Sequence, residues 1–102
     1  MRRYILAPEA EQDLDDIKEY LVKEAGVSVA RYVLRRLKES IVFLGGTPGA
    51  GHVREDLTNI DVKFWPVFSY LIVYRSASRP IEIVRIVHGS QYITRILGKI
   101  GN

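Results

Sequence analysis

Six residues in the second half of the sequence have side chains that could bind and cleave a phosphodiester: Arg54, Tyr74, Arg75, Arg85, His88 and Tyr92. Arginine supplies positive charge and bidentate donors, and histidine titrates near neutral pH. Such groups suffice for metal-free RNA cleavage through the 2′-hydroxyl. The same residues also have a purely structural interpretation, in which arginines pair with acids such as Glu82 and the histidine ends its strand with a backbone hydrogen bond. Residue types alone leave both interpretations open.

Other kinds of catalytic site are not indicated. No serine lies in a recognisable nucleophile elbow, and the acids between residues 9 and 24 are typical of a solvated helix face. The glycine-rich segment from Thr47 to Gly51 lacks a GKS or GKT ending, so we expect a connecting loop rather than a phosphate-binding loop. With no cysteine and two histidines, the sequence predicts no metal site and no cofactor.

Strands must position most of these six residues. Two apolar runs, Tyr70 to Tyr74 and Ile81 to Val87, flank a polar break that ends in Pro80, which suits a turn. A third short run, Val62 to Trp65, precedes Pro66. We therefore predict a three-stranded antiparallel meander.

The last strand of this meander is apolar on both faces. Strict alternation places Ile81, Ile83 and Val87 on the face of Arg85, and Val84 and Ile86 on the face of Glu82 and His88. A strand of this kind is typical of the middle of a sheet, with something packed on each side.

Two amphipathic helices precede the meander. The first starts at Pro8 and ends at Gly26, and the second ends at Gly45-Gly46. A short strand, Arg3 to Leu6, comes before them, and Tyr92 to Ile100 has the spacing of a short closing helix. The helices form an antiparallel hairpin whose apolar stripes pack on one face of the mainly antiparallel sheet. The predicted fold is an α+β domain with the order β-α-α-β-β-β.

Length and composition bound the remaining possibilities. The chain has 102 residues, enough for one domain over residues 1–102. We expect no membrane span and no secretion signal, and hence a cytoplasmic protein. Charge is distributed unevenly: residues 9–24 carry seven acids, whereas the rest of the chain carries thirteen of the fifteen basic residues. The basic part is either a solvated surface or a site for an anionic partner.

Several runs in this order resemble the RelE/ParE superfamily of bacterial toxins, and most closely its ParE branch. The resemblance covers nearly the whole chain. The matching segments are the opening Ile5 to Leu14, the loop Pro48 to Leu57, Phe64-Trp65-Pro66-Val67, Tyr70 to Arg75, and Ile81 to Gly89.

The resemblance implies a toxin of a type II toxin–antitoxin system, bound and neutralised by a small antitoxin in a hetero-oligomer. ParE-like members inhibit DNA gyrase, and RelE-like members are endoribonucleases that cut messenger RNA on the ribosome. ParE-like chains usually read HGRRDI after the last strand, where this chain reads His88-Gly89-Ser90-Gln91-Tyr92-Ile93. The lysine-rich segment of RelE is also missing, because residues 49–62 contain one basic residue, Arg54. The gyrase interpretation is therefore favoured, with ribosome-dependent RNA cleavage as the alternative.

Two surfaces are assigned on this basis. The target-binding patch comprises Arg54, Tyr74, Arg75, Arg85, His88 and Tyr92, with the segment Ser90 to Ile100 contributing; in the nuclease alternative all of these except Tyr74 are the catalytic candidates. The antitoxin is expected against the hairpin and the sheet, at Arg31, Arg35, Arg36, Leu71 and Val73.

Overall fold

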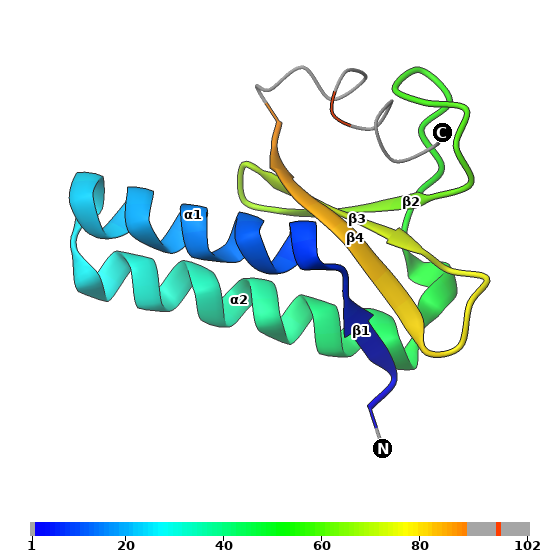
Figure 1. The fold of residues 1–102 in the computed structure, drawn as a ribbon, viewed down its shortest axis with the longest axis horizontal. Helices are drawn as coiled ribbons and strands as arrows, with labels where there is room; N and C mark the ends of the chain where they lie inside the picture. The colour runs from blue at the N-terminus through cyan, green and yellow to red at the C-terminus, as the bar shows by residue number, and fades with distance from the viewer. Residues whose placement is uncertain (1, 90–95, 97–102) are drawn as a thin grey trace.

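The computed structural model describes residues 2–89 and 96, and two long helices fill its first half. Helix α1 (Pro8–Ala25) starts with a proline, where the missing amide costs no helical hydrogen bond. Helix α2 (Val27–Gly46) follows directly after Gly26, whose φ of 96° favours glycine. Because the Gly26 amide donates to the carbonyl of Leu21, the chain reverses within a single residue. The two helices consequently run antiparallel, side by side (Figure 1).

The strands form one open four-stranded sheet in the order β1-β4-β3-β2. They are β1 (Tyr4–Leu6), β2 (Lys63–Val67), β3 (Tyr70–Arg75) and β4 (Ile81–His88), and a 3₁₀ turn, η1 (Pro48–Ala50), follows α2. Strand β1 pairs parallel with β4, and the other neighbours pair antiparallel. The predicted α+β class and the order β-α-α-β-β-β are confirmed.

Strand β2 continues through Pro66, two residues beyond the predicted run from Val62 to Trp65. The Phe64 amide and carbonyl bond to His52, on the side away from β3. The backbone nitrogen of Pro66 points the same way as that of Phe64, away from β3, because the direction of backbone groups alternates along a strand. Its missing amide therefore costs no bond to β3, as expected for proline on an edge strand.

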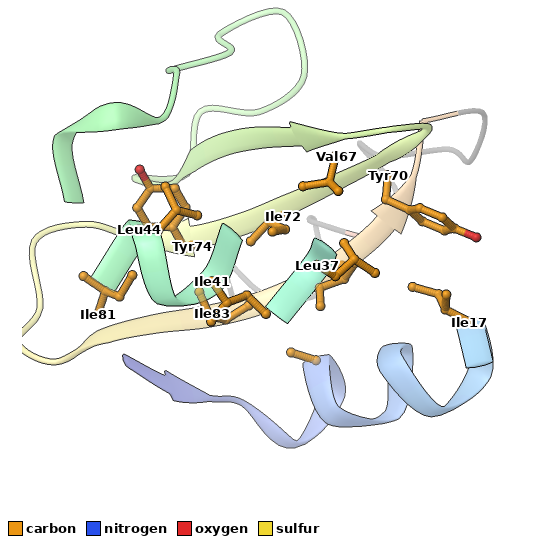
Figure 2. Packing of buried hydrophobic residues seen from close by; sticks show 12 residues of the cluster. Ile17, Leu37, Ile41, Leu44, Val67, Tyr70, Ile72, Tyr74, Ile81 and Ile83 are labelled. Atoms are coloured by element: carbon orange, nitrogen blue, oxygen red, sulfur yellow. The ribbon is translucent and has the colours of Figure 1, made fainter. Parts of the chain in front are cut away.

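Both helices pack on one face of the sheet and make the main core (Figure 2). Its buried members come from α1, α2 and the last three strands: Ala10, Ile17, Leu37, Ile41, Leu44, Val67, Tyr70, Ile72, Tyr74, Ile81, Ile83 and Ile86. A second, smaller cluster comprises Val62, Phe64, Val73, Val84 and Val87, with Leu57, Ile60, Leu71 and Ile96 packed against it. The central strands are thus covered on both faces, which explains their continuous apolar sequence.

The predicted faces of β4 are wrong beyond Ile83. Val73 of β3 pairs with Arg85, while its neighbour Tyr74 pairs with Ile83, so Val84 is an extra residue in a β-bulge. The bulge shifts the alternation by one position. Ile86 therefore joins Ile81 and Ile83 on the helix side, while Val84 and Val87 share the other cluster. A bulge lets every aliphatic residue of β4 be buried and turns Arg85 toward the strand's edge.

The predicted closing helix over residues 92–100 lies outside the described residues, apart from Ile96. Within the described part of the chain, no helix is both long and apolar enough to span a bilayer.

Candidate functional site

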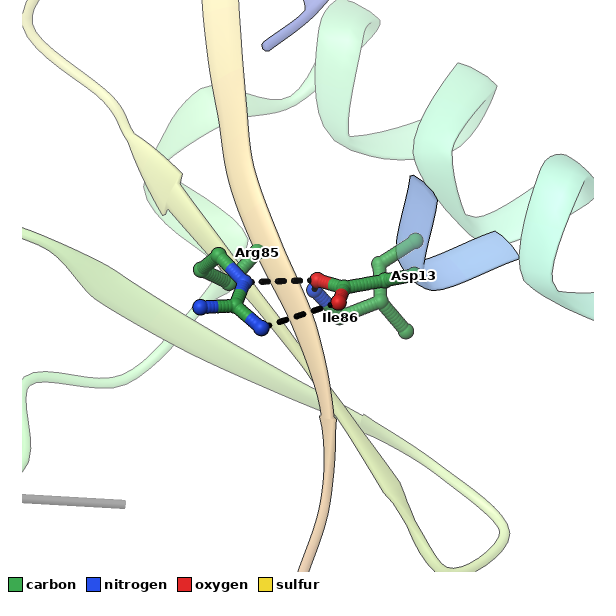
Figure 3. Close-up of polar contacts among 3 residues, drawn as sticks. All are labelled: Asp13, Arg85 and Ile86. Atoms are coloured by element: carbon green, nitrogen blue, oxygen red, sulfur yellow. Dashed lines mark hydrogen bonds and ion pairs between the residues drawn. The ribbon is translucent and has the colours of Figure 1, made fainter. Parts of the chain in front are cut away.

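Arg85 is held by α1. Strand β1 ends at Leu6, so the outer edge of β4 beyond Ile83 faces α1 instead of another strand. The Asp13 carboxylate of α1 accepts two hydrogen bonds from the Arg85 guanidinium, from Nε at 2.8 Å and from Nη2 at 2.9 Å (Figure 3). It also accepts the Ile86 amide at 2.8 Å. Asp13 thus provides the acceptor for a backbone amide at the unpaired edge of β4 and binds Arg85 at the same time.

Electrostatics make this ion pair strong. The Asp13 side chain is 11% exposed and that of Arg85 is 22% exposed, so water screens the two charges only partly. The hydrogen bonds to Asp13 raise the pKa of Arg85 more than burial lowers it. Arg85 is therefore a permanent cation whose charge is already neutralised, and its two bonded nitrogens are not available to a phosphate.

The other two predicted arginines also have carboxylate partners. Arg75 lies 3.3 Å from Glu82, its cross-strand neighbour, as the structural interpretation of the sequence expected. Arg54 makes two bonds to Asp56 in an exposed loop, at 2.9 and 2.8 Å, and these bonds raise the pKa of Arg54 and lower that of Asp56. Each of the three predicted arginines is thus paired with an acid.

Tyr74 belongs to the core rather than to an exposed patch. It is fully buried, and its hydroxyl donates to the Pro48 carbonyl at 2.7 Å and accepts the Gly51 amide at 2.8 Å. A Cβ at Gly51 would clash with this hydroxyl, so the loop can approach Tyr74 only because residue 51 is glycine. Burial raises the pKa of Tyr74 above the usual value for tyrosine. The side chain fastens the glycine-rich loop to the sheet.

His88 lies at the far end of β4 from Arg75. Glu82, opposite Arg75, and His88 are six residues apart, or about 20 Å at the rise of a strand. The His88 and Tyr70 rings lie nearly perpendicular to each other, with centroids 5.4 Å apart. The predicted patch is therefore dispersed over the loop, the core and both ends of the sheet, and its sixth member, Tyr92, lies outside the described residues.

One hollow does bring two predicted residues together. An open depression of about 430 Å³ lies between α1 and the ends of β3 and β4, and it is lined by Asp13, Asp16, Ile17, Tyr20, Tyr70, Arg85, Ile86 and His88. Because Asp13 is paired with Arg85, Asp16 is the acid whose charge disfavours a phosphate here and favours a neutral or cationic group. In the described part of the chain, no cluster of three or more His, Asp or Glu residues could hold a metal ion.

The residues predicted to bind an antitoxin lie on two different surfaces. Arg31, Arg35 and Arg36 are exposed on α2. Leu71 and Val73 belong to the cluster on the opposite face of the sheet, where Val73 is fully buried. The hairpin and this part of the sheet do not form one continuous surface.

Sequence reasoning missed Asp13, which was counted among the solvated acids of the first helix. A signal for it exists, because Asp13 follows Ala10 by three residues and precedes Ile17 by four, and both of those are buried. An acid on the apolar stripe of a helix must have a polar partner on the element against which the stripe packs.

Comparison with known families identifies this architecture. The family described as ParE toxin of type II toxin-antitoxin system, parDE, matches residues 4–92. The chain belongs to the ParE toxin family. The structure is also similar to that of a chromosomal ParDE toxin–antitoxin system from P. aeruginosa, with a TM-score of 0.70 and 21% sequence identity over 83% of this chain and 92% of that chain. No curated protein matches the sequence at a significant level. This ParE family member therefore has the fold and the family that its sequence motifs predicted.

Proposed function

We propose that this ParE family member inhibits DNA gyrase by binding it, in the cytoplasm, and that a cognate antitoxin neutralises it. The observation that carries the choice of target is the neutralisation of Arg85 by Asp13. A nuclease that works without a metal has to present cationic donors to the scissile phosphate. Arg85, the arginine that lines the hollow with His88, is instead held in a largely buried ion pair with Asp13. This pairing supports inhibition by binding rather than by chemistry.

The target surface is assigned to the His88 end of the sheet, to the exposed Arg54 and the partly exposed Arg75, and to the segment of residues 90–100. Tyr74 is omitted because its side chain is buried. An exposed arginine in a weak surface ion pair can exchange its partner at little cost, since such pairs contribute about 0–1 kcal/mol. Arg85 contributes by shaping the hollow beside His88 rather than by touching gyrase.

The test mixes the purified chain with gyrase, supercoiled plasmid and ATP, and measures linear DNA trapped by detergent. We expect cleavage complexes to accumulate with the wild-type chain, and their yield to fall in the double variant Arg54→Ala, Arg75→Ala, which leaves the core intact. Gyrase that supercoils normally in the presence of excess folded chain would exclude this target.

Ribosome-dependent cleavage of messenger RNA is the second candidate. The observation in its favour is the hollow that His88 and Arg85 both line, because a histidine is a common general acid or base and Nη1 of the guanidinium is not bonded to Asp13. Primer extension on a translated message decides between the two: codon-specific cuts that disappear in His88→Gln would replace the gyrase proposal. Normal growth after strong induction without antitoxin would contradict both candidates.

The antitoxin is proposed to bind α2. Among the described residues, Arg31 and Arg35 have no carboxylate within ion-pair distance, and Arg36 has only Glu39 at 3.6 Å. A small acidic partner would supply the missing charges.

A further inference from the structure

Two aromatic rings and two arginines form a small exposed cluster where α2 meets the β2–β3 turn. Tyr32 and Phe68 lie with ring centroids 5.9 Å apart. The Arg35 guanidinium is 5.5 Å from the Tyr32 ring, and that of Arg36 is 5.6 Å from the Phe68 ring. Tyr32 is 44% exposed and Phe68 is 56% exposed. We call these four residues the α2–turn patch.

Phe68 has an unfavourable backbone conformation. Its φ of 54° is in the left-handed region, and among the described non-glycine residues it is the only one with a positive φ. Phe68 and Ser69 form the two-residue turn between Val67 and Tyr70. A positive φ at the first turn position alone is the pattern of a type II′ turn, which prefers glycine there. The fold thus keeps a bulky ring, mostly in solvent, where glycine would be less strained.

The charges of α2 are also unfavourable to the isolated chain. Arg31 and Arg35 are one helical turn apart and repel each other. Strain at Phe68 and like-charge repulsion on the helix against which its ring lies are departures from local stability, and such departures concentrate at functional sites. What would relieve the repulsion is negative charge brought by a partner.

Composition favours a protein partner over a nucleic acid. Tyrosine, phenylalanine and arginine are the residue types enriched where proteins bind each other. Val27 and Val29, near the start of the same helix, are 56% and 44% exposed. Exposed valines offer nothing to a base or a phosphate but can be buried against an apolar side chain. A second copy of the chain is disfavoured because a twofold interface would bring the arginines of both copies together.

We propose that the α2–turn patch binds an acidic segment of the antitoxin, in which one apolar or aromatic anchor packs against Tyr32 and Phe68. Flanking carboxylates pair with Arg35 of the patch and with Arg31, one helical turn away. The main hollows of the described chain are lined by other residues, so the anchor lies on the rings rather than in a deep pocket. This inference rests on the antitoxin partner of the proposed function and assigns its contact chemistry. Phe68 is the specificity residue: its ring serves binding, although glycine at this position would make the turn less strained.

The test uses the whole chain and a short synthetic peptide rich in glutamate with one central phenylalanine, and it measures affinity by titration calorimetry. We expect Phe68→Asn to weaken binding by about tenfold or more, as for a hot-spot residue. Asparagine tolerates the left-handed conformation, so the thermal midpoint should stay within about 3 °C of the wild type or rise. A large fall in the midpoint would mean that Phe68 is structural and would overturn the proposal.

The charge contacts are tested by the double variant Arg31→Glu, Arg35→Glu. Its matched control is Lys18→Glu, Lys23→Glu, which changes the net charge equally on the exposed face of α1. We expect at least tenfold weaker binding in the arginine variant and wild-type affinity, within about twofold, in the lysine variant. Equal weakening in both variants would mean non-specific attraction and would overturn the proposal.

Other occupants give different results. Undiminished binding of a peptide with alanine at its centre would exclude the apolar anchor. Tighter binding of single-stranded oligothymidylate, lost in the same arginine variant, would identify a nucleic-acid site instead. Concentration-dependent dimers abolished by Phe68→Asn would identify a second copy. Gyrase trapping is measured on the same variants without peptide. The peptide affinities therefore remain interpretable even if the gyrase proposal fails.

Discussion

The arginines of the sheet and those of α2 look alike in the sequence, but their surroundings differ. In the sheet, Arg75 and Arg85 lie 3.3 and 2.8 Å from a carboxylate. On α2, Arg31 has no such partner among the described residues, and Arg35 lies over the Tyr32 ring. The sheet arginines were predicted to act on a phosphate, whereas the structure leaves the unbalanced positive charge on the helix. Charge that is balanced in a largely buried pair belongs to stability, whereas charge that is unbalanced or weakly paired at the surface is available for binding.

The strongest test of this contrast removes the carboxylate at the more buried pair. Asp13→Ala leaves the Arg85 charge without its partner and the Ile86 amide without its acceptor. We expect a loss of about 2–4 kcal/mol in the free energy of unfolding, because breaking a largely buried pair leaves an uncompensated charge. Urea denaturation measures it. The control Asp15→Ala, on the exposed side of the same helix, should change stability by about 0.5 kcal/mol or less. Equal effects of the two substitutions would place Arg85 among the available charges.

The next effect separates Tyr74 from the functional patch in which the sequence placed it. Tyr74→Phe removes the hydroxyl that bonds to Pro48 and Gly51. We expect a loss of about 1–2 kcal/mol of stability from the two lost hydrogen bonds, measured by urea denaturation. Gyrase trapping by the folded variant should stay at the wild-type level, since the side chain is buried. Normal stability together with lost activity would return Tyr74 to the functional site.

The raised pKa of Tyr74 gives a pH dependence with a defined sign. Burial favours the neutral phenol in the folded state, so the unfolded chain loses this proton first as pH rises. Stability from this group is complete below the unfolded pKa of about 10 and falls as pH increases toward the raised folded value. Because lysines titrate in the same range, the measurement is the difference between the wild type and Tyr74→Phe in urea midpoint at pH 8 and at pH 11. The stability advantage of the wild type should shrink at the higher pH, and a constant difference would contradict it.

The sequence predicted the elements better than the contacts between them. Helical spacing around Leu37 and Ile41, the glycine after α1 and the apolar runs of β3 and β4 are local signals, and local signals determined the order of elements. The bulge at Val84 depends on the register of β4 against β3, and the residue type at that position does not predict it. The faces of β4 were therefore assigned wrongly from strict alternation.

Pairings between residues far apart in the chain were the hardest feature to predict from the sequence. Asp13 and Arg85 are 72 positions apart, so only the approach of α1 to the edge of β4 makes them partners. Arg75 and Glu82 face each other across a hairpin, and here the alternative interpretation of the sequence anticipated the ion pair. The patch was predicted from side-chain chemistry alone, and chemistry does not reveal which charges the fold will balance.

The smallest expected effect is a change in stability whose sign differs between an arginine of α2 and an arginine of the sheet. Arg31→Gln removes one of two like charges at i and i+4 on α2, and glutamine is nearly as good a helix former as arginine. Stability should stay the same or rise by about 0.2–0.5 kcal/mol, more at low salt than at high salt because salt screens the repulsion. Arg85→Gln, in contrast, should lower stability, since the Asp13 charge then lacks its partner. Urea midpoints of both variants at low and high salt measure the two signs. A loss of stability in Arg31→Gln comparable with that in Arg85→Gln would mean that the helix arginine is held by the fold after all, and the distinction between balanced and available charge would not apply to α2.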